Sequence, residues 1–206
     1  MKRTITTLIF ISAIFNYCIG QTNMKDCFLS MPDSLCVYLT VLERTEMLTK
    51  YEKSDTTGVL NKLQKNSKIE SLDEDYIKVS LSAASDLQMK LFTSNSGDKN
   101  ICFVRTLRLP QTQSQVMIFD ANWSLKMTAD KIVSSYRELL ACPDEMSEDD
   151  FETARKNLFP YLYCAELGSD SDVLTVMPVV AFDIYADDNV RKIMSKKDIR
   201  LQDMVQ

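Results

Sequence analysis

The chain has 206 residues, of which 45% are hydrophobic and 26% charged, so it is long enough to bury a substantial core. Its 29 acidic and 24 basic residues give a formal net charge of −5, which argues against binding nucleic acid through phosphates. It has no histidine, which excludes Ser-His-Asp and Cys-His catalysis and nearly all mixed zinc or iron sites. We therefore expect no cofactor, no metal ion and no nucleic-acid partner.

The first twenty residues have the pattern of a signal peptide. Lys2 and Arg3 form a basic start, and an apolar run from Leu8 to Ile14 follows that is too short to span a bilayer. Cleavage after Gly20 would leave residues 21–206 and, with two basic residues lost, change the formal charge from −5 to −7. No later apolar run approaches about 18 residues, so we expect export to the periplasm or cell surface without a membrane span.

Two helical segments are predicted at the start of the mature chain. Asp26 to Tyr38 has apolar residues three and four positions apart, with an interruption at Pro32. Thr40-Val41-Leu42-Glu43 matches the capping box, so a second helix is predicted from Val41 to about Tyr51. We expect this helix to bury Leu42, Met47, Leu48 and Tyr51.

The centre of the chain predicts antiparallel strands. In Tyr76–Leu81 and Leu87–Phe92, apolar residues alternate with polar ones, which is typical of strands with one packed and one wet face. Ile101–Leu109 is largely apolar on both faces, which favours a central strand covered on both sides. Further strands are predicted at Val59-Leu60, Lys68–Leu72 and Gln115–Phe119, with turns at 82–86 and 94–100.

The second half combines helices with one more hairpin. Helices are predicted over Ala129–Leu140, from a Ser147 cap to about Leu158, and from Asp187 to about Lys196. Strands are predicted over Tyr161–Leu167, Val173–Val180 and Ile199–Leu201. With no linker or boundary evident, residues 21–206 are expected to form one α+β domain, an antiparallel sheet with helices packed largely on one face.

Few residues suggest a site. Arg105 interrupts an apolar strand face, so an anion contact is one interpretation, although we favour an arginine at the rim that lies along apolar surface with its head in water. Asp170 and Asp172 alternate in a loop, but two carboxylates are too few for calcium. The acidic clusters at 73–75 and 144–152 contain no evident pair at the 5–9 Å separation that glycoside hydrolysis requires. We assign no catalytic residue.

The cysteine count permits more than one arrangement. Export would leave five cysteines, an odd number, in a compartment that permits disulfides. We favour buried thiols that pack as small hydrophobic side chains, and the alternative is one or two disulfides at most. The pairing stays open among Cys27, Cys36, Cys102, Cys142 and Cys164.

Four stretches resemble a family of exported Bacteroidales proteins of unknown function. They are Asp26-Cys27-Phe28-Leu29-Ser30-Met31-Pro32-Asp33-Ser34-Leu35, Leu72–Leu91, Cys102–Trp123 and Pro143–Phe151. The resemblance implies export to the envelope and an unassigned activity, with no catalytic residue to carry over. It also implies O-glycosylation at aspartate followed by serine or threonine and then an apolar or small residue. Ser34 and Thr56 have that context, although Ser34 also fits a helix cap.

We interpret the chain as an exported, non-catalytic module of the bacterial cell envelope that binds a protein or glycan partner. The alternative is a carboxylate-dependent hydrolase acting on glycan, and a third possibility is a structural component of the envelope. A cleft with two convergent acids would favour the hydrolase, whereas an apolar or aromatic surface would favour the binding module.

Overall fold

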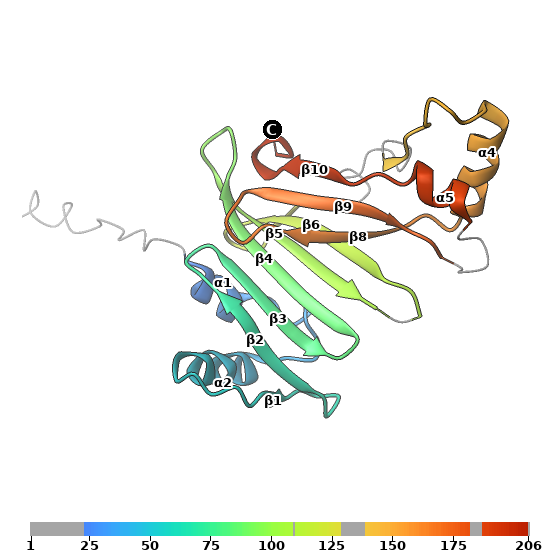
Figure 1. Ribbon diagram of the computed structural model, residues 1–206. Coiled ribbons are helices and arrows are strands. Elements are labelled where there is room, and N and C mark those ends of the chain that lie inside the picture. Colours follow the sequence, from blue (N-terminus) through green and yellow to red (C-terminus); the bar gives the residue numbers. More distant parts are fainter. Residues whose placement is uncertain (1–22, 109, 129–138, 182–186, 206) are drawn as a thin grey trace, which may run out of the picture.

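The structure, a computed structural model, describes residues 23–108, 110–128, 139–181 and 187–205. Its centre is a seven-stranded antiparallel sheet whose strands are neighbours in chain order (Figure 1). Each strand is therefore reached from the one before by a short turn, the simplest way to build a sheet. The strands are β1 (Val59–Leu60), β2 (Asn66–Leu72), β3 (Tyr76–Ser82), β4 (Ser85–Thr93), β5 (Lys99–Leu107), β6 (Gln113–Asp120) and β7 (Leu125–Thr128).

The sheet is covered on both faces at its centre. Strand β5 is buried at nearly every position, as its apolar faces predict. Strand β4 is buried from Ser85 to Phe92, which includes Gln88 and Lys90, the residues expected on a wet face. That expectation is wrong because both polar side chains bind a second layer of the protein, described below.

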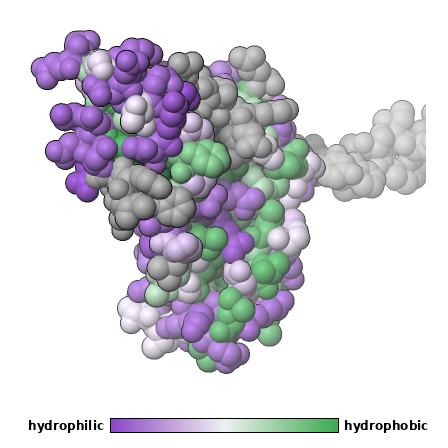
Figure 2. Space-filling view, turned by 90° about the vertical axis from the view of Figure 1, so that its right-hand side faces the viewer, coloured by the Kyte–Doolittle hydropathy of each residue, from purple (hydrophilic) through white to green (hydrophobic). Residues whose placement is uncertain are grey.

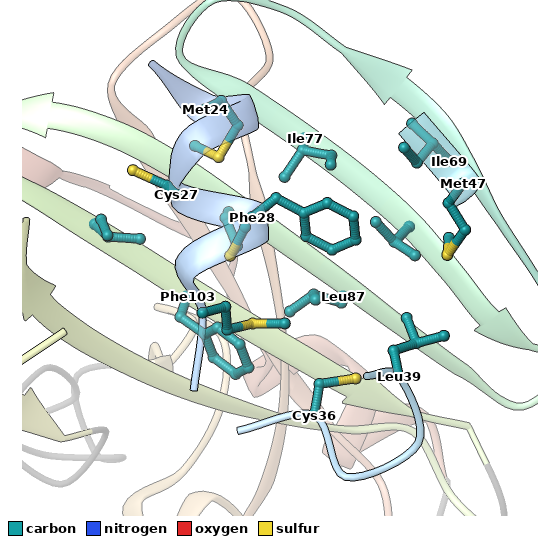
Figure 3. Close-up of a cluster of buried hydrophobic side chains, with 14 of the residues drawn as sticks. Met24, Cys27, Phe28, Cys36, Leu39, Met47, Ile69, Ile77, Leu87 and Phe103 are labelled. Carbon is teal, nitrogen blue, oxygen red and sulfur yellow. The ribbon is translucent and has the colours of Figure 1, made fainter. Parts of the chain in front are cut away.

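One face of the sheet carries helices α1 (Met24–Ser30) and α2 (Val41–Glu52). Figure 3 shows Met24 and Phe28 of α1 packed over the sheet residues Ile77, Leu87 and Phe103. These side chains are fully buried, and each stabilises the fold by roughly 1.5–3 kcal/mol through the apolar surface it removes from water. The expected placement of helices on one face is confirmed.

The start of α2 and the burial of Met47 and Leu48 are confirmed, whereas the expected burial of Leu42 and Tyr51 is wrong. The Thr40 side chain accepts the Glu43 amide, and the Glu43 carboxylate accepts the Thr40 amide, so the capping box is complete. Leu42 is 77% exposed and Tyr51 37% exposed, because the helix turns another stripe toward the sheet. The residues of that stripe are Arg44, Met47 and Leu48.

The segment after Pro32 is not helical, contrary to the prediction over 26–38. Helix α1 ends at Ser30, and residues 33–38 form turns, with Leu35 N–H bonded to the Pro32 carbonyl at 3.0 Å. Proline removes a backbone donor and disfavours helix in the residue before it, so the helix stops rather than kinks. A helix cap at Ser34 is therefore excluded.

A second, three-stranded antiparallel sheet covers the other face of the large sheet (Figure 1). Its buried residues, including Ala165 and Val176, pack against Cys102, Val104 and Ile118 of the large sheet. The result is three layers, with helices on one side of the large sheet and strands on the other. The elements of this layer are β8 (Leu162–Leu167), β9 (Val173–Val179), β10 (Lys197–Arg200) and the short 3-10 helix η3 (Leu201–Asp203).

Helices α4 (Glu148–Asn157) and α5 (Asp188–Ile193) pack on each other at one corner, through Phe151, Leu158 and Val190. Ser147 caps α4 as predicted. The proposed signal peptide and most of the predicted helix 129–140 lie outside the described residues. Across the residues that are described, no helix is long and apolar enough to cross a membrane.

Candidate functional site

Two grooves of similar volume, about 620 and 660 Å³, lie on the surface. The groove of about 660 Å³ is the more polar and lies where β6 extends beyond the end of β7. Strand β7 pairs with β6 only at Met117, Ile118 and Phe119, so the first residues of β6 border this opening. We call it the β6 groove. It is lined by polar side chains, namely Arg105, Gln113, Gln115, Thr128, Tyr161 and Tyr163, together with apolar residues of β5 and β6.

Arg105 lines the β6 groove, and its position follows from the strand register. It faces the helical side of β5, directly opposite Gln115 on β6. Its guanidinium carbon lies 5.1 Å from the centre of the Tyr38 ring, a cation–π contact. Its Nε atom is buried without a hydrogen-bond partner, and no carboxylate of the described residues forms an ion pair with it.

Tyr161, which lines the β6 groove, packs against the neighbouring ring of Phe159. Tyr161 is 41% exposed and Phe159 67% exposed, and their rings meet edge to face with centroids 5.8 Å apart. The hydrogen bonds that Arg155 of α4 donates to Glu152 raise the pKa of the Arg155 guanidinium, and Tyr161 contributes a smaller part of this increase. Figure 2 shows this end of the molecule. A mainly hydrophilic corner lies at the height of α4, and below it hydrophobic and hydrophilic residues are mixed.

A smaller, more apolar groove of about 360 Å³ adjoins the β6 groove. Leu107 lines both, and Tyr38, on which Arg105 stacks, lines the smaller one. Leu63 and Leu107 are 56% and 46% exposed there. The two grooves form one surface that is apolar at the β3–β4 turn and polar and aromatic near β8.

The second large groove lies between α2 and β2 and contains the predicted modification site. Thr56 is exposed on its rim, in the loop after α2. The Asp55 carboxylate accepts both the amide (2.9 Å) and the hydroxyl (2.7 Å) of Thr57, and these bonds lower the pKa of Asp55. Ser34 is exposed too, in a turn beside Asp33, which binds Arg44. Both remain predictions as modification sites.

The acidic clusters singled out in the sequence lie beside a lysine and at a helix start. Asp75 lies 3.0 Å from Lys90 Nζ, and the first turn of α4 contains Glu148, Asp149 and Asp150, where the helix dipole favours acids. Asp55 and Glu70 line one groove, but Asp55 is held ionised by Thr57 and Glu70 lies 3.7 Å from Lys78. Among the described residues, no cluster of three potential metal ligands occurs.

The described cysteines are all free thiols. Cys27, Cys36 and Cys102 are buried, Cys164 is partly buried and Cys142 is exposed. Burial raises the pKa of the Cys27 thiol to about 11 and also raises those of Cys36 and Cys102. The interpretation as small hydrophobic side chains is therefore the one that the buried three support.

Sequence reasoning singled out Arg105 but not its neighbours in the β6 groove. Gln115 was assigned only to a strand and Gln113 to no element, and Tyr161 and Tyr163 were assigned to a hairpin 46 or more positions away along the chain. One signal was available, because cross-strand pairing of β5 with β6 places Gln115 opposite Arg105. Nothing in the sequence indicated that β8 lies beside β6.

The fold and the site define an α+β protein with a large antiparallel sheet, helices on one face, a second sheet on the other, and an open groove at one end. The chain belongs to the family described as protein of unknown function (DUF3256), whose model matches residues 17–196. The predicted membership of a family without assigned activity is thereby confirmed.

The fold is similar to that of a solved structure. It is a domain of an uncharacterized protein from Porphyromonas gingivalis W83, with a TM-score of 0.61 at 16% sequence identity, covering 84% of this chain and 90% of that chain. At this identity the similarity concerns the fold alone. No curated protein matches the chain.

Proposed function

We propose that the protein is an exported, non-catalytic binding module of the bacterial cell envelope and that its binding surface is the β6 groove. The observation that carries the proposal is the composition of this groove. It combines a cation without an ion pair, exposed amide side chains and tyrosine rings, the mixture that a binding site uses for orientation and contact area.

The hydrolase alternative has less support. It requires one carboxylic acid that stays protonated and a second carboxylate facing it. Among the described residues, none that lines the β6 groove is acidic, and Asp55 of the other large groove has a lowered pKa. A lowered pKa favours the ionised form, which cannot donate a proton as a general acid.

The test uses the mature chain and a panel of oligosaccharides and peptides, with binding measured by calorimetry and products by mass spectrometry. The matched variants are Gln113→Ala with Gln115→Ala, both exposed in the groove, and Lys68→Gln, exposed at the other groove. We expect a ligand that is returned intact and whose affinity falls at least about tenfold only in the glutamine variant. Conversion of the ligand to product, or an affinity that is unchanged in the glutamine variant, would refute the proposal.

A further inference from the structure

The side chains that line the β6 groove favour one class of ligand. Building on the proposed function, we infer that the groove binds a saccharide that bears a carboxylate, and that Arg105 contacts the carboxylate. The inference rests on three features of the groove, which are its isolated positive charge, its neutral polar groups and its aromatic wall.

The charge of the groove is opposite to that of the chain. The chain has a formal net charge of −5, yet Arg105 is the one charged residue that lines the groove among the residues described. An unpaired guanidinium is a strong donor that fits the two oxygens of a carboxylate in a bidentate arrangement. Its stacking on Tyr38 restricts the guanidinium before a ligand arrives, and its buried Nε has no hydrogen-bond partner. A ligand anion therefore gains two donors from a side chain that is already ordered.

The neutral groups of the groove fit hydroxyl-rich ligands. Gln113, Gln115 and Thr128 are exposed and combine donors with acceptors, as sugar hydroxyls do. Gln115 lies directly opposite Arg105 on the neighbouring strand, with Cβ atoms roughly 5 Å apart, so its amide and the guanidinium can contact neighbouring groups of one ligand.

Two tyrosines at the start of β8, Tyr161 and Tyr163, provide the third feature. Tyr161, directly before β8, is 41% exposed, and Tyr163 lies two residues further along the extended chain in β8, so both line the groove. A tyrosine ring offers an apolar face with a polar edge, which suits a sugar ring whose C–H face is apolar and whose rim is hydroxylated. Charge, hydrogen bonding and an apolar face are together the properties of an acidic sugar.

The decisive probes are a galacturonate hexamer and its methyl ester, which differ in charge but share their hydroxyl pattern. Sialyllactose with lactose, and a hyaluronate hexamer with its methyl ester, extend the test to other acidic sugars, and hexaglutamate serves as the acidic peptide. Binding to the mature chain is measured by calorimetry at two salt concentrations. The variants are Arg105→Gln, Arg105→Lys, Gln115→Ala and the charge-matched control Lys68→Gln.

We expect at least one acidic sugar to bind about tenfold or more tightly than its neutral counterpart, and less tightly at higher salt. Arg105→Gln should abolish that preference, Arg105→Lys should keep part of it, and Lys68→Gln should leave it unchanged. Gln115→Ala, on an exposed side chain, should weaken binding about threefold or more whether or not Arg105→Gln folds.

Other outcomes separate the two proposals. Equal binding of acid and neutral sugar, weakened by Gln115→Ala, overturns this inference and leaves the binding function standing. Tighter binding of hexaglutamate than of every acidic sugar also overturns it. If no acidic sugar binds, the inference is overturned. If no ligand in the panel binds with an affinity that depends on the groove residues, the binding function is overturned as well.

Discussion

Gln88 on β4 accepts the backbone N–H of Leu167 on β8 through its side-chain oxygen, at 3.0 Å and fully inside the protein. Two residues earlier on β8, the Ala165 N–H donates to the Ser114 hydroxyl of β6 at 2.9 Å. Strand β8 is the edge of its sheet, and these side chains satisfy alternate donors along that edge. The second layer is therefore fastened to the first by hydrogen bonds as well as by apolar packing.

Replacing Gln88 by leucine should destabilise the protein by about 1–3 kcal/mol, because it leaves the buried Leu167 N–H without a partner. Urea denaturation measures this as a lower midpoint with an unchanged slope. Gln113→Leu, an exposed glutamine of the same sheet, is the matched control and should change stability by less than about 0.5 kcal/mol. Equal effects of the two substitutions would mean that the hydrogen bond to β8 contributes nothing.

Arg44 should be required to hold the turns after α1. It is fully buried in α2, and it donates to the Met31 carbonyl at 2.6 Å and to Asp33 at 2.8 Å. Arg44→Ala should cost about 3 kcal/mol, because it opens a cavity and leaves a buried carbonyl unpaired. Asp33→Ala should cost about 1–2 kcal/mol, since the Asp33 side chain is 54% exposed and its attraction is screened. The reverse order in thermal or urea unfolding would contradict this assignment.

The protein should lose stability above about pH 9. Burial raises the pKa of Cys27 from 9.0 to about 11, and burial is also the main cause that raises the pKa of Tyr76 from 10.0 to about 12. Each group is neutral when protonated, so the unfolded chain loses these protons at lower pH than the folded one. The stabilisation is complete below pH 9 and falls as pH rises toward 11, by about 2–3 kcal/mol for Cys27.

Cys27→Ala provides the test of that pH dependence. The variant should be less stable than the parent at pH 8, because it removes a buried side chain, but its free energy of unfolding should fall less steeply between pH 9 and pH 11. Urea unfolding at several pH values gives both slopes. Parallel slopes in parent and variant would show that Cys27 does not titrate as described.

Thr56 should be O-glycosylated in the native organism if the resemblance to exported Bacteroidales proteins extends to processing. The hydroxyl lies in an exposed loop directly after Asp55, where an enzyme can reach it. Intact mass spectrometry of the native protein should show a mass above that of residues 21–206, and Thr56→Val should remove the excess. A mass equal to that of the bare mature chain would exclude modification at Thr56 and Ser34 alike.

The strands of the large sheet could be predicted from the sequence because each signal is local. The alternation in Ile77, Val79 and Leu81 and the two apolar faces of β5 report burial directly. The capping box at Thr40 is equally local. The antiparallel α+β class follows from these elements and their short turns.

What the sequence did not reveal depends on contacts between distant segments. Gln88 and Lys90 have the polarity of a wet face, yet β8 and its turn bury them, with Lys90 Nζ donating to the Ser169 carbonyl at 2.7 Å. Leu42 was expected to be buried because it is apolar, whereas Arg44 is the residue that the stripe of α2 buries. The β6 groove likewise exists only because Tyr161 and Tyr163 fold back beside β6, 46 or more positions from Gln115.

The β6 groove is tested most directly as a binding site by a map of amide chemical-shift changes. The labelled mature chain is titrated for this with its tightest oligosaccharide ligand. We predict that the changes concentrate at residues 105–107, 113–117 and 161–163, and that the ligand is recovered unaltered. Changes concentrated around residues 50–70, or the appearance of hydrolysis products during the titration, would contradict the assignment of the β6 groove as a non-catalytic binding site.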